Sequence, residues 1–212
     1  MDPSSIFLPK LAADRARYLG EYSERFENVL NADDAAPLFA ECNADRARFR
    51  VAVHPAATWV RDELFRPALA QTPPDVTRRV VFTAGRNAVG NSSALAYSQA
   101  GHWAHVVFDS TFSSAAHARR LIDRALAADW PNTVVHVDRR LEDAFVSMLE
   151  RARGEGRVVG IEQMIHSHRG AAETVGGLAD GFRHHVRCDF RFLVNSAQGI
   201  REGSIELTGL QD

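Results

Sequence analysis

Residues 80–93 read VVFTAGRNAVGNSS, and this stretch decides the fold. Its first three residues, Val80-Val81-Phe82, form a short apolar run that is typical of a strand buried on both faces of a parallel sheet. Gly85 ends the run, and residues 94–99 beyond the serines have helical character. The stretch therefore predicts a strand, a glycine-containing loop and a helix in succession.

The same alternation continues towards the C-terminus. Three further apolar runs predict strands, at 105–108, 133–137 and 186–194. Three amphipathic segments predict helices between and after them, at 118–126, 141–149 and 161–179. The apolar face of the middle helix comprises Leu141, Ala144, Phe145, Met148 and Leu149. This alternation predicts an α/β fold with a mainly parallel sheet.

The segment before this core has a helical pattern. Leu19, Tyr22, Phe26, Val29 and Leu30 recur at helical spacing and are expected on one face of a helix. Residues 31–37 form a turn-like stretch, and Pro55 suits the first turn of a second helix. The run 71–75, with its two prolines, then breaks the chain. We expect a helical N-terminal arm at 1–72 and an α/β core at 73–212.

Composition excludes several classes of protein. The 212 residues carry a formal net charge of -2, which gives no basic field for nucleic acid. No apolar run approaches the length of a membrane span, and we expect no signal peptide at the N-terminus. Cys42 and Cys188 form no close-spaced motif, so neither a disulfide framework nor a zinc site is expected. A reducing cytoplasm is the simplest expected location.

The loop after the first strand has the spacing of a phosphate-binding P-loop. Two glycines are separated by four residues, and a serine follows two positions later, in Gly85-Arg86-Asn87-Ala88-Val89-Gly90-Asn91-Ser92-Ser93. Glycines allow successive N–H groups to point at phosphate oxygens, and the start of the next helix adds its positive end. The hydroxyl of Ser92 would take the position that holds Mg²⁺ in such loops. The alternative is a glycine-rich turn in an ordinary α/β domain.

One position departs from this motif. Asn91 stands where a P-loop has lysine, and Lys10 is the single lysine of the chain. An amide can donate a hydrogen bond to phosphate, but it is uncharged and cannot neutralise the negative charge of the transition state. Arg86, inside the loop, is a candidate substitute cation.

Several downstream segments, in this order and spacing, resemble the zeta-toxin family of P-loop kinases. Residues 106–113, VVFDSTFS, are similar to the strand and substrate loop of that family, with an acid-x-Thr step. Residues 150–159, ERARGEGRVV, resemble its arginine-containing lid. Residues 192–196, FLVNS, resemble the last strand, which ends near the adenine. The likeness covers roughly residues 78–196.

The resemblance implies a three-layer P-loop NTPase-like fold and a kinase. Such an enzyme uses ATP or GTP with Mg²⁺ to phosphorylate a small molecule, such as a nucleotide sugar or a nucleotide. Asp109 would accept the proton of the acceptor hydroxyl and Thr111 would contact the acceptor. Asn195 would lie at the nucleotide. The lid arginines that would close over the γ-phosphate are Arg151, Arg153 and Arg157. An antitoxin or another protein is the kind of macromolecular partner that the family implies.

Alternatives stay open for the main features. Asp109 is also a candidate cap for a helix starting near Ser113, and the arginines suit a solvated helix end. The spacing of His166 and His168 does not favour a metal site. The family usually places a further strand, with an Asp base, between the P-loop and the acid-x-Thr loop, and only residues 94–104 separate them here. Together with Asn91, this supports a rival interpretation, a pseudokinase that binds nucleotide or protein without catalysis.

Overall fold

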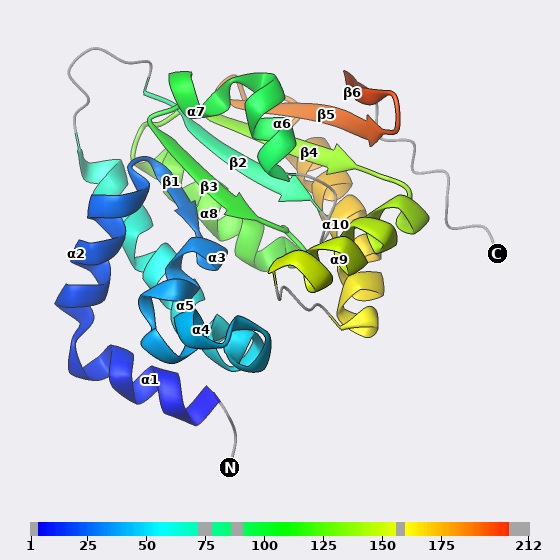
Figure 1. The fold of residues 1–212 in the computed structure, drawn as a ribbon. Helices are drawn as coiled ribbons and strands as arrows, with labels where there is room; N and C mark the ends of the chain where they lie inside the picture. The colour runs from blue at the N-terminus through cyan, green and yellow to red at the C-terminus, as the bar shows by residue number, and fades with distance from the viewer. Residues whose placement is uncertain (1–3, 72–77, 86–90, 156–159, 204–212) are drawn as a thin grey trace.

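The structure is a computed structural model that describes residues 4–71, 78–85, 91–155 and 160–203. Its strands are β1 (Val29–Asn31), β2 (Val80–Gly85), β3 (Val106–Ser110), β4 (Asn132–Asp138), β5 (Cys188–Ser196) and β6 (Gly199–Glu202). They form one sheet in the order β1-β3-β2-β4-β5-β6, shown in Figure 1. All neighbours are parallel except β5 and β6, which are antiparallel. The predicted α/β fold with a mainly parallel sheet is therefore confirmed.

Helices cover both faces of this sheet. They are α1 (Ser4–Ala13), α2 (Arg15–Phe26), α3 (Ala32–Ala35), α4 (Ala40–Ala44), α5 (Arg46–Ala70), α6 (Asn91–Ser98), α7 (Ala100–Trp103), α8 (Ala115–Ala127), α9 (Leu141–Glu155) and α10 (Ile161–Gly181). Side chains that alternate along β2 bury themselves in different clusters, because successive residues of a strand face opposite sides. Phe82 packs with residues of α5, α8 and α10, whereas Val81 packs with Ala94 of α6. The predicted helices at 118–126, 141–149 and 161–179 correspond to α8, α9 and α10.

The N-terminal segment differs from its prediction, because it is not wholly helical. Helix α2 ends at Phe26, and Val29 and Leu30 lie in strand β1 instead of on the helix face. β1 pairs with β3 in parallel, which joins the arm to the edge of the sheet. The arm also shares the largest hydrophobic cluster, in which Phe65 of α5 contacts Phe82 and Phe108 edge-on.

Three boundaries also differ. Helix α5 begins at Arg46, so Pro55 lies inside the helix and not in its first turn. β5 begins at Cys188, and Val186 before it is 98% exposed, so this valine is not in a buried strand. The expected polar tail contains β6, whose strand pairs with Leu193 to Ser196 of β5. These features depend on tertiary contacts that no local pattern contains.

Candidate functional site

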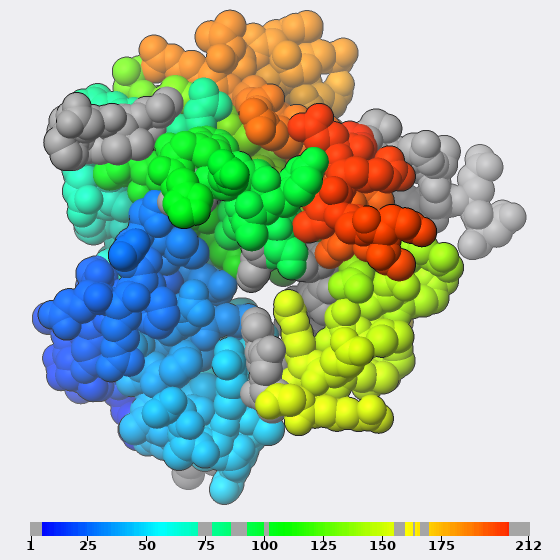
Figure 2. All heavy atoms as spheres, turned by 45° about the horizontal axis from the view of Figure 1, so that its top comes forward, coloured from blue at the N-terminus to red at the C-terminus, as the bar shows by residue number. Residues whose placement is uncertain are grey.

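The parallel strands end together at one edge of the sheet. Asn31, Gly85, Asp109 and Asp138 lie at or near the carboxyl ends of β1, β2, β3 and β4. Open α/β sheets bind their ligands at this edge, where successive connections leave in opposite directions. Here β3 pairs with β2 on one side, and β4, the next strand along the chain, pairs with β2 on the other side. Figure 2 shows a hollow at this end, between the blue and cyan arm and the yellow-green α9. We treat this edge as the candidate site.

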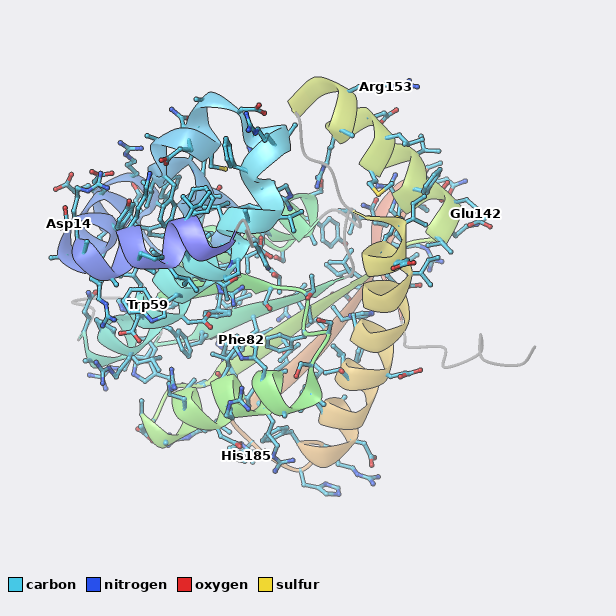
Figure 3. All side chains as sticks on the ribbon, turned by 90° about the horizontal axis from the view of Figure 1, so that it is seen from below. Asp14, Trp59, Phe82, Glu142, Arg153 and His185 are labelled. Carbon is cyan, nitrogen blue, oxygen red and sulfur yellow. The ribbon has the colours of Figure 1, made fainter. Side chains whose placement is uncertain are left out.

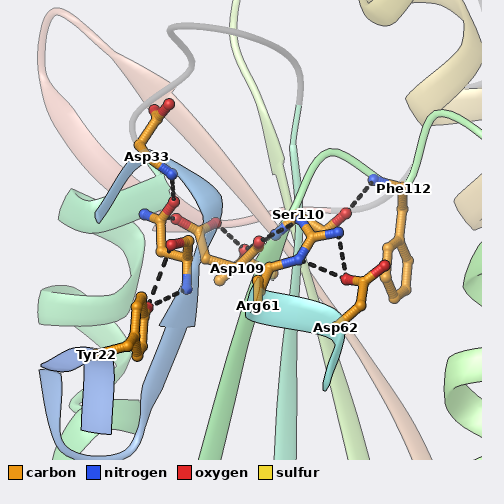
Figure 4. Close-up of polar contacts among 9 residues, drawn as sticks. Tyr22, Asp33, Arg61, Asp62, Asp109, Ser110 and Phe112 are labelled. Carbon is orange, nitrogen blue, oxygen red and sulfur yellow. Dashed lines mark hydrogen bonds and ion pairs between the residues drawn. The ribbon is translucent and has the colours of Figure 1, made fainter. Parts of the chain in front are cut away.

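Asp109 is the centre of a polar cluster at this edge (Figure 4). Its Oδ1 accepts a hydrogen bond from the Thr83 hydroxyl, and its Oδ2 accepts one from Asn31 Nδ2 at 2.9 Å. Thr83 is fully buried on β2 and faces Asp109 across the β2–β3 ladder. The same hydroxyl accepts from the Ser110 backbone N–H at 3.1 Å. The carboxylate therefore has a fixed orientation beside the end of β2.

Asn31 holds both the carboxylate and the next helix. Its Oδ1 accepts from the Asp33 backbone N–H at 2.7 Å, so Asn31 is the N-cap of α3. Its own backbone N–H donates to the hydroxyl of Tyr22 at 2.7 Å. That hydroxyl also lies 2.9 Å from the carbonyl oxygen of Val29, and burial raises the pKa of Tyr22. Tyr22 thus fixes β1 on α2, and β1 places Asn31 against Asp109.

Arg61 of α5 brings a buried charge to the same place. The residue is 7% exposed, and its guanidinium forms an ion pair with Asp62 at 2.7 Å. Its Nη1 donates to the carbonyl oxygen of Asp109 at 3.3 Å, and its Cζ lies 4.5 Å from the centre of the Phe108 ring. A guanidinium is well suited to such combined stacking and hydrogen bonding. The arm therefore contributes backbone, amide and cationic contacts to the candidate site.

Two histidines near this cluster have lowered pKa values. Burial lowers the pKa of His117 on α8, Arg61 lowers it further, and Asp62 opposes both effects. Desolvation also lowers the pKa of His54 on α5, despite the nearby carboxylate of Asp33. Burial therefore disfavours the protonated form of both imidazoles.

The expected phosphate loop begins at this edge. Gly85 is the last residue of β2, and α6 starts at Asn91 and packs against β2 and β4. Ser93, in the first turn of α6, is exposed. Arg86, Asn87, Ala88, Val89 and Gly90 lie outside the described residues, as do the side chains of Asn91 and Ser92. The described residues thus place a strand before residues 86–90 and a helix after them.

The loop after β3 begins at Thr111, two residues after Asp109. The Thr111 hydroxyl lies 3.2 Å from that of Ser113. Phe112 takes a φ of 49°, which is unfavourable for a bulky residue, and its ring packs on Phe82 at 5.5 Å. The cap of α8 is Ser114, which accepts from the His117 N–H, so the interpretation of Asp109 as a helix cap is wrong. Asp109 bonds Asn31 and Thr83 because parallel pairing puts both strands beside it.

The expected lid residues lie on and after α9. Arg151 is partly buried and shares a helix face with Ala144 and Met148, at spacings of seven and three residues. Arg153 is exposed, and in Figure 3 it points away from the body of the molecule. Arg157 lies outside the described residues. Asn195, partly buried on β5, pairs with Ile200 of β6 at the same edge of the sheet.

A separate groove of about 510 Å³ lies at the opposite edge. Its lining includes Asn28 just before β1 and Gln71 just after α5. Ala104 and His105, just before β3, also line it. The rings of His105 and Trp130 lie tilted against each other with centroids 4.7 Å apart. This groove is at the amino ends of the strands, and Tyr22, whose hydroxyl bonds Asn31 in the polar cluster, also lines it.

Neither a metal centre nor a membrane-spanning helix is evident among the described residues. In the part of the chain that is described, no three His, Cys, Asp or Glu side chains gather in a way that could hold a metal ion. Across the same residues, no helix combines the length and apolar character needed to cross a membrane. No protein-family model matches the chain, and no curated protein matches it.

Sequence reasoning identified Asp109 and Gly85 but missed Asn31 and Thr83. Asn31 is 78 residues from Asp109, and Thr83 is 26 residues away. One local signal was available for Asn31, since asparagine followed by Asp33 and Asp34 suits a helix N-terminus. Thr83 had none, because a threonine inside a strand is ordinary.

Proposed function

We propose that the protein is a phosphotransferase that moves the γ-phosphate of ATP or GTP to a hydroxyl of a small molecule. The acceptor class that the family resemblance suggests is a nucleotide sugar, a nucleotide or a related metabolite. One observation carries the proposal: Asp109 is held on β3 directly beside β2, the strand that leads into the glycine loop. A proton acceptor next to a phosphate loop is the minimum that such a reaction requires.

The glycine loop is assigned to the nucleotide. Backbone N–H groups of 85–90 and the N-terminus of α6 would bind the phosphates, because both present positive partial charge. Ser92 would hold Mg²⁺, which bridges the β- and γ-phosphates and neutralises charge during transfer. Asn195, at the end of β5, is assigned to the nucleotide on the resemblance alone.

Asp109 is assigned to the acceptor. A carboxylate oxygen can accept more than one hydrogen bond, so a hydroxyl of the acceptor would donate to Asp109. Thr111, two residues along, would orient the same acceptor. Arg151 and Arg157 are assigned to the γ-phosphate, since arginine offers bidentate bonds to phosphate. The outward direction of Arg153 gives it no such role in the arrangement described.

A second candidate is a nucleotide-binding or protein-interaction module without catalysis. The specific observation in its favour is Asn91, which removes the loop charge that normally follows the phosphate. The two candidates differ in turnover, which the following experiment measures.

The test is phosphoryl transfer followed by ³¹P NMR, with MgATP and a panel of nucleotide sugars and nucleoside monophosphates. Wild-type protein should produce a new phosphomonoester, and Asp109→Asn should lower turnover by about 10²–10⁴-fold with MgATP affinity nearly unchanged. The matched control is the double variant Asn31→Asp/Asp109→Asn, which exchanges donor and acceptor and keeps their hydrogen bond. Compared with Asp109→Asn alone, this double variant should have a higher free energy of unfolding but the same low turnover. MgATP binding by wild type without any transfer would favour the second candidate.

A further inference from the structure

Helix α9 leaves much of its apolar surface uncovered. Leu141, Phe145, Val146 and Leu149 are 40%, 36%, 54% and 40% exposed. The buried side chains of the helix, Ala144 and Met148, form a small cluster with Met164 of α10 that is separate from the two larger cores. A contiguous exposed apolar patch on one helix is typical of a surface that binds another protein.

The outer face of α9 has the spacing of a coiled-coil seam. Glu142, Val146, Leu149 and Arg153 follow one another at steps of four, three and four residues. That spacing keeps four side chains in one line along a helix, as at the a and d positions of a heptad. All four residues are exposed, whereas Ala144 and Met148 lie on the other side. Figure 3 shows Glu142 and Arg153 near the two ends of α9, both pointing away from the body.

This seam is complementary to itself. When two copies of it run antiparallel, each Glu142 lies opposite Arg153 of the second copy, and each Val146 lies opposite Leu149 of the second copy. The two central layers are then apolar, and each outer layer pairs a negative with a positive side chain. This charge pattern fixes the antiparallel direction and the register of the two helices. We propose that α9 pairs antiparallel with α9 of a second copy of this chain, through a two-fold symmetric interface.

The charges support a second copy over an unrelated partner. A two-fold interface uses the same patch on both subunits, so it needs a patch carrying both signs in mirrored positions. Glu142 and Arg153 meet that requirement on one helix. The exposed ion pair of Glu142 with Arg140, at 3.5 Å, is no obstacle, because such pairs contribute little.

Four layers make a small interface, so the dimer is weak. Interfaces below about 1,200 Å² of buried surface belong to transient complexes. We expect the dimer of the 23.4 kDa chain to have a dissociation constant on the order of tens of micromolar.

The test is sedimentation equilibrium of the full chain from about 1 to 300 µM, a range chosen around the affinity expected for a small interface. Leu149→Glu should weaken dimerisation by tenfold or more, since it places a charge in an apolar layer. Glu142→Arg alone and Arg153→Glu alone should each weaken it several-fold by facing like charges. The double variant Glu142→Arg/Arg153→Glu should restore dimerisation to near the wild-type level, because the exchange recreates both charged layers.

Two controls keep the result interpretable. Val186→Glu introduces the same charge at an exposed apolar residue outside α9, in the turn before β5, and should leave dimerisation unchanged. Far-UV circular dichroism and a thermal melt establish that each variant folds. The proposal is overturned if wild type stays monomeric at 300 µM, if Leu149→Glu dimerises like wild type, or if the double charge exchange is no better than the single ones.

Discussion

The two sides of the hollow at the carboxyl edge are built in different ways. The arm side is joined to the sheet by β1, by the aromatic cluster around Phe65 and by the bonds between Asn31 and Asp109. The α9 side rests on a cluster of three buried side chains, with most of its large apolar residues exposed. Tight packing makes an interior resist rearrangement, whereas few buried contacts allow local opening. The arm side is therefore suited to fixing chemical groups, and the α9 side to moving or to binding another protein.

The largest expected effect comes from breaking the arm core. Phe65 is fully buried between Phe82 and Phe108, so Phe65→Ala should lower the free energy of unfolding by about 3–5 kcal/mol. Met148→Ala should cost about 2 kcal/mol, at the low end for such changes, because the small α9 cluster can relax around the missing atoms. Urea unfolding measures both values. Equal losses would mean that the two sides are equally well packed.

A smaller effect is expected from Asn31. Asn31→Ala removes the bond to Asp109 and the cap of α3, which should cost about 1–3 kcal/mol of stability. Its matched control is Asn28→Ala, just before β1, which loses a 2.8 Å bond from Asn28 to the carbonyl oxygen of Ala104 at the opposite edge.

Both asparagine variants should lose stability, but only Asn31→Ala should lower kcat, by roughly tenfold, because it frees the orientation of Asp109. Restoring a donor with Asn31→Gln should recover part of that loss. If Asn28→Ala lowers kcat equally, then Asn31 acts only through stability.

The smallest effect concerns pH. Burial lowers the pKa of His117 in the folded state below its unfolded value near 6.5. Unfolded chains therefore bind more protons just below that pH, and stability falls as the pH drops through about 6.5. His117→Gln should reduce the fall in melting temperature between pH 7.5 and pH 5 by roughly 1–2 °C. Identical pH dependence of the two proteins would show that His117 is not linked to folding.

Local pattern predicted the centre of the fold and not its edges. The three central strands β2, β3 and β4 are short runs with buried residues on both faces, so composition alone indicates them. β1 has three residues, and Val29 and Leu30 continue the helical spacing of α2. They form a strand because β3 offers backbone partners 78 residues away, which no local pattern contains.

The same limit applies to the candidate site. Asp109 was predictable because it ends an apolar strand at the edge where ligands bind. Its orientation was not, because Thr83 and Asn31 reach it only after the sheet has assembled. The exposure of apolar residues on α9 was also unexpected, since Leu141, Phe145 and Leu149 have the spacing of a buried face.

Calorimetric titration with MgATP measures whether the segment after β2 binds nucleotide phosphates. A lysine at 91 would add charge-assisted bonds of about 1.5–3 kcal/mol each, so Asn91→Lys should tighten binding about tenfold or more. Asn43→Lys on α4 makes the same change at an exposed distant site and should have no effect. If Arg86 already supplies the charge, Asn91→Lys should help little and Arg86→Ala should weaken binding instead. Unchanged affinity in both Asn91→Lys and Arg86→Ala would contradict a phosphate site in this loop, and with it the proposed phosphotransferase.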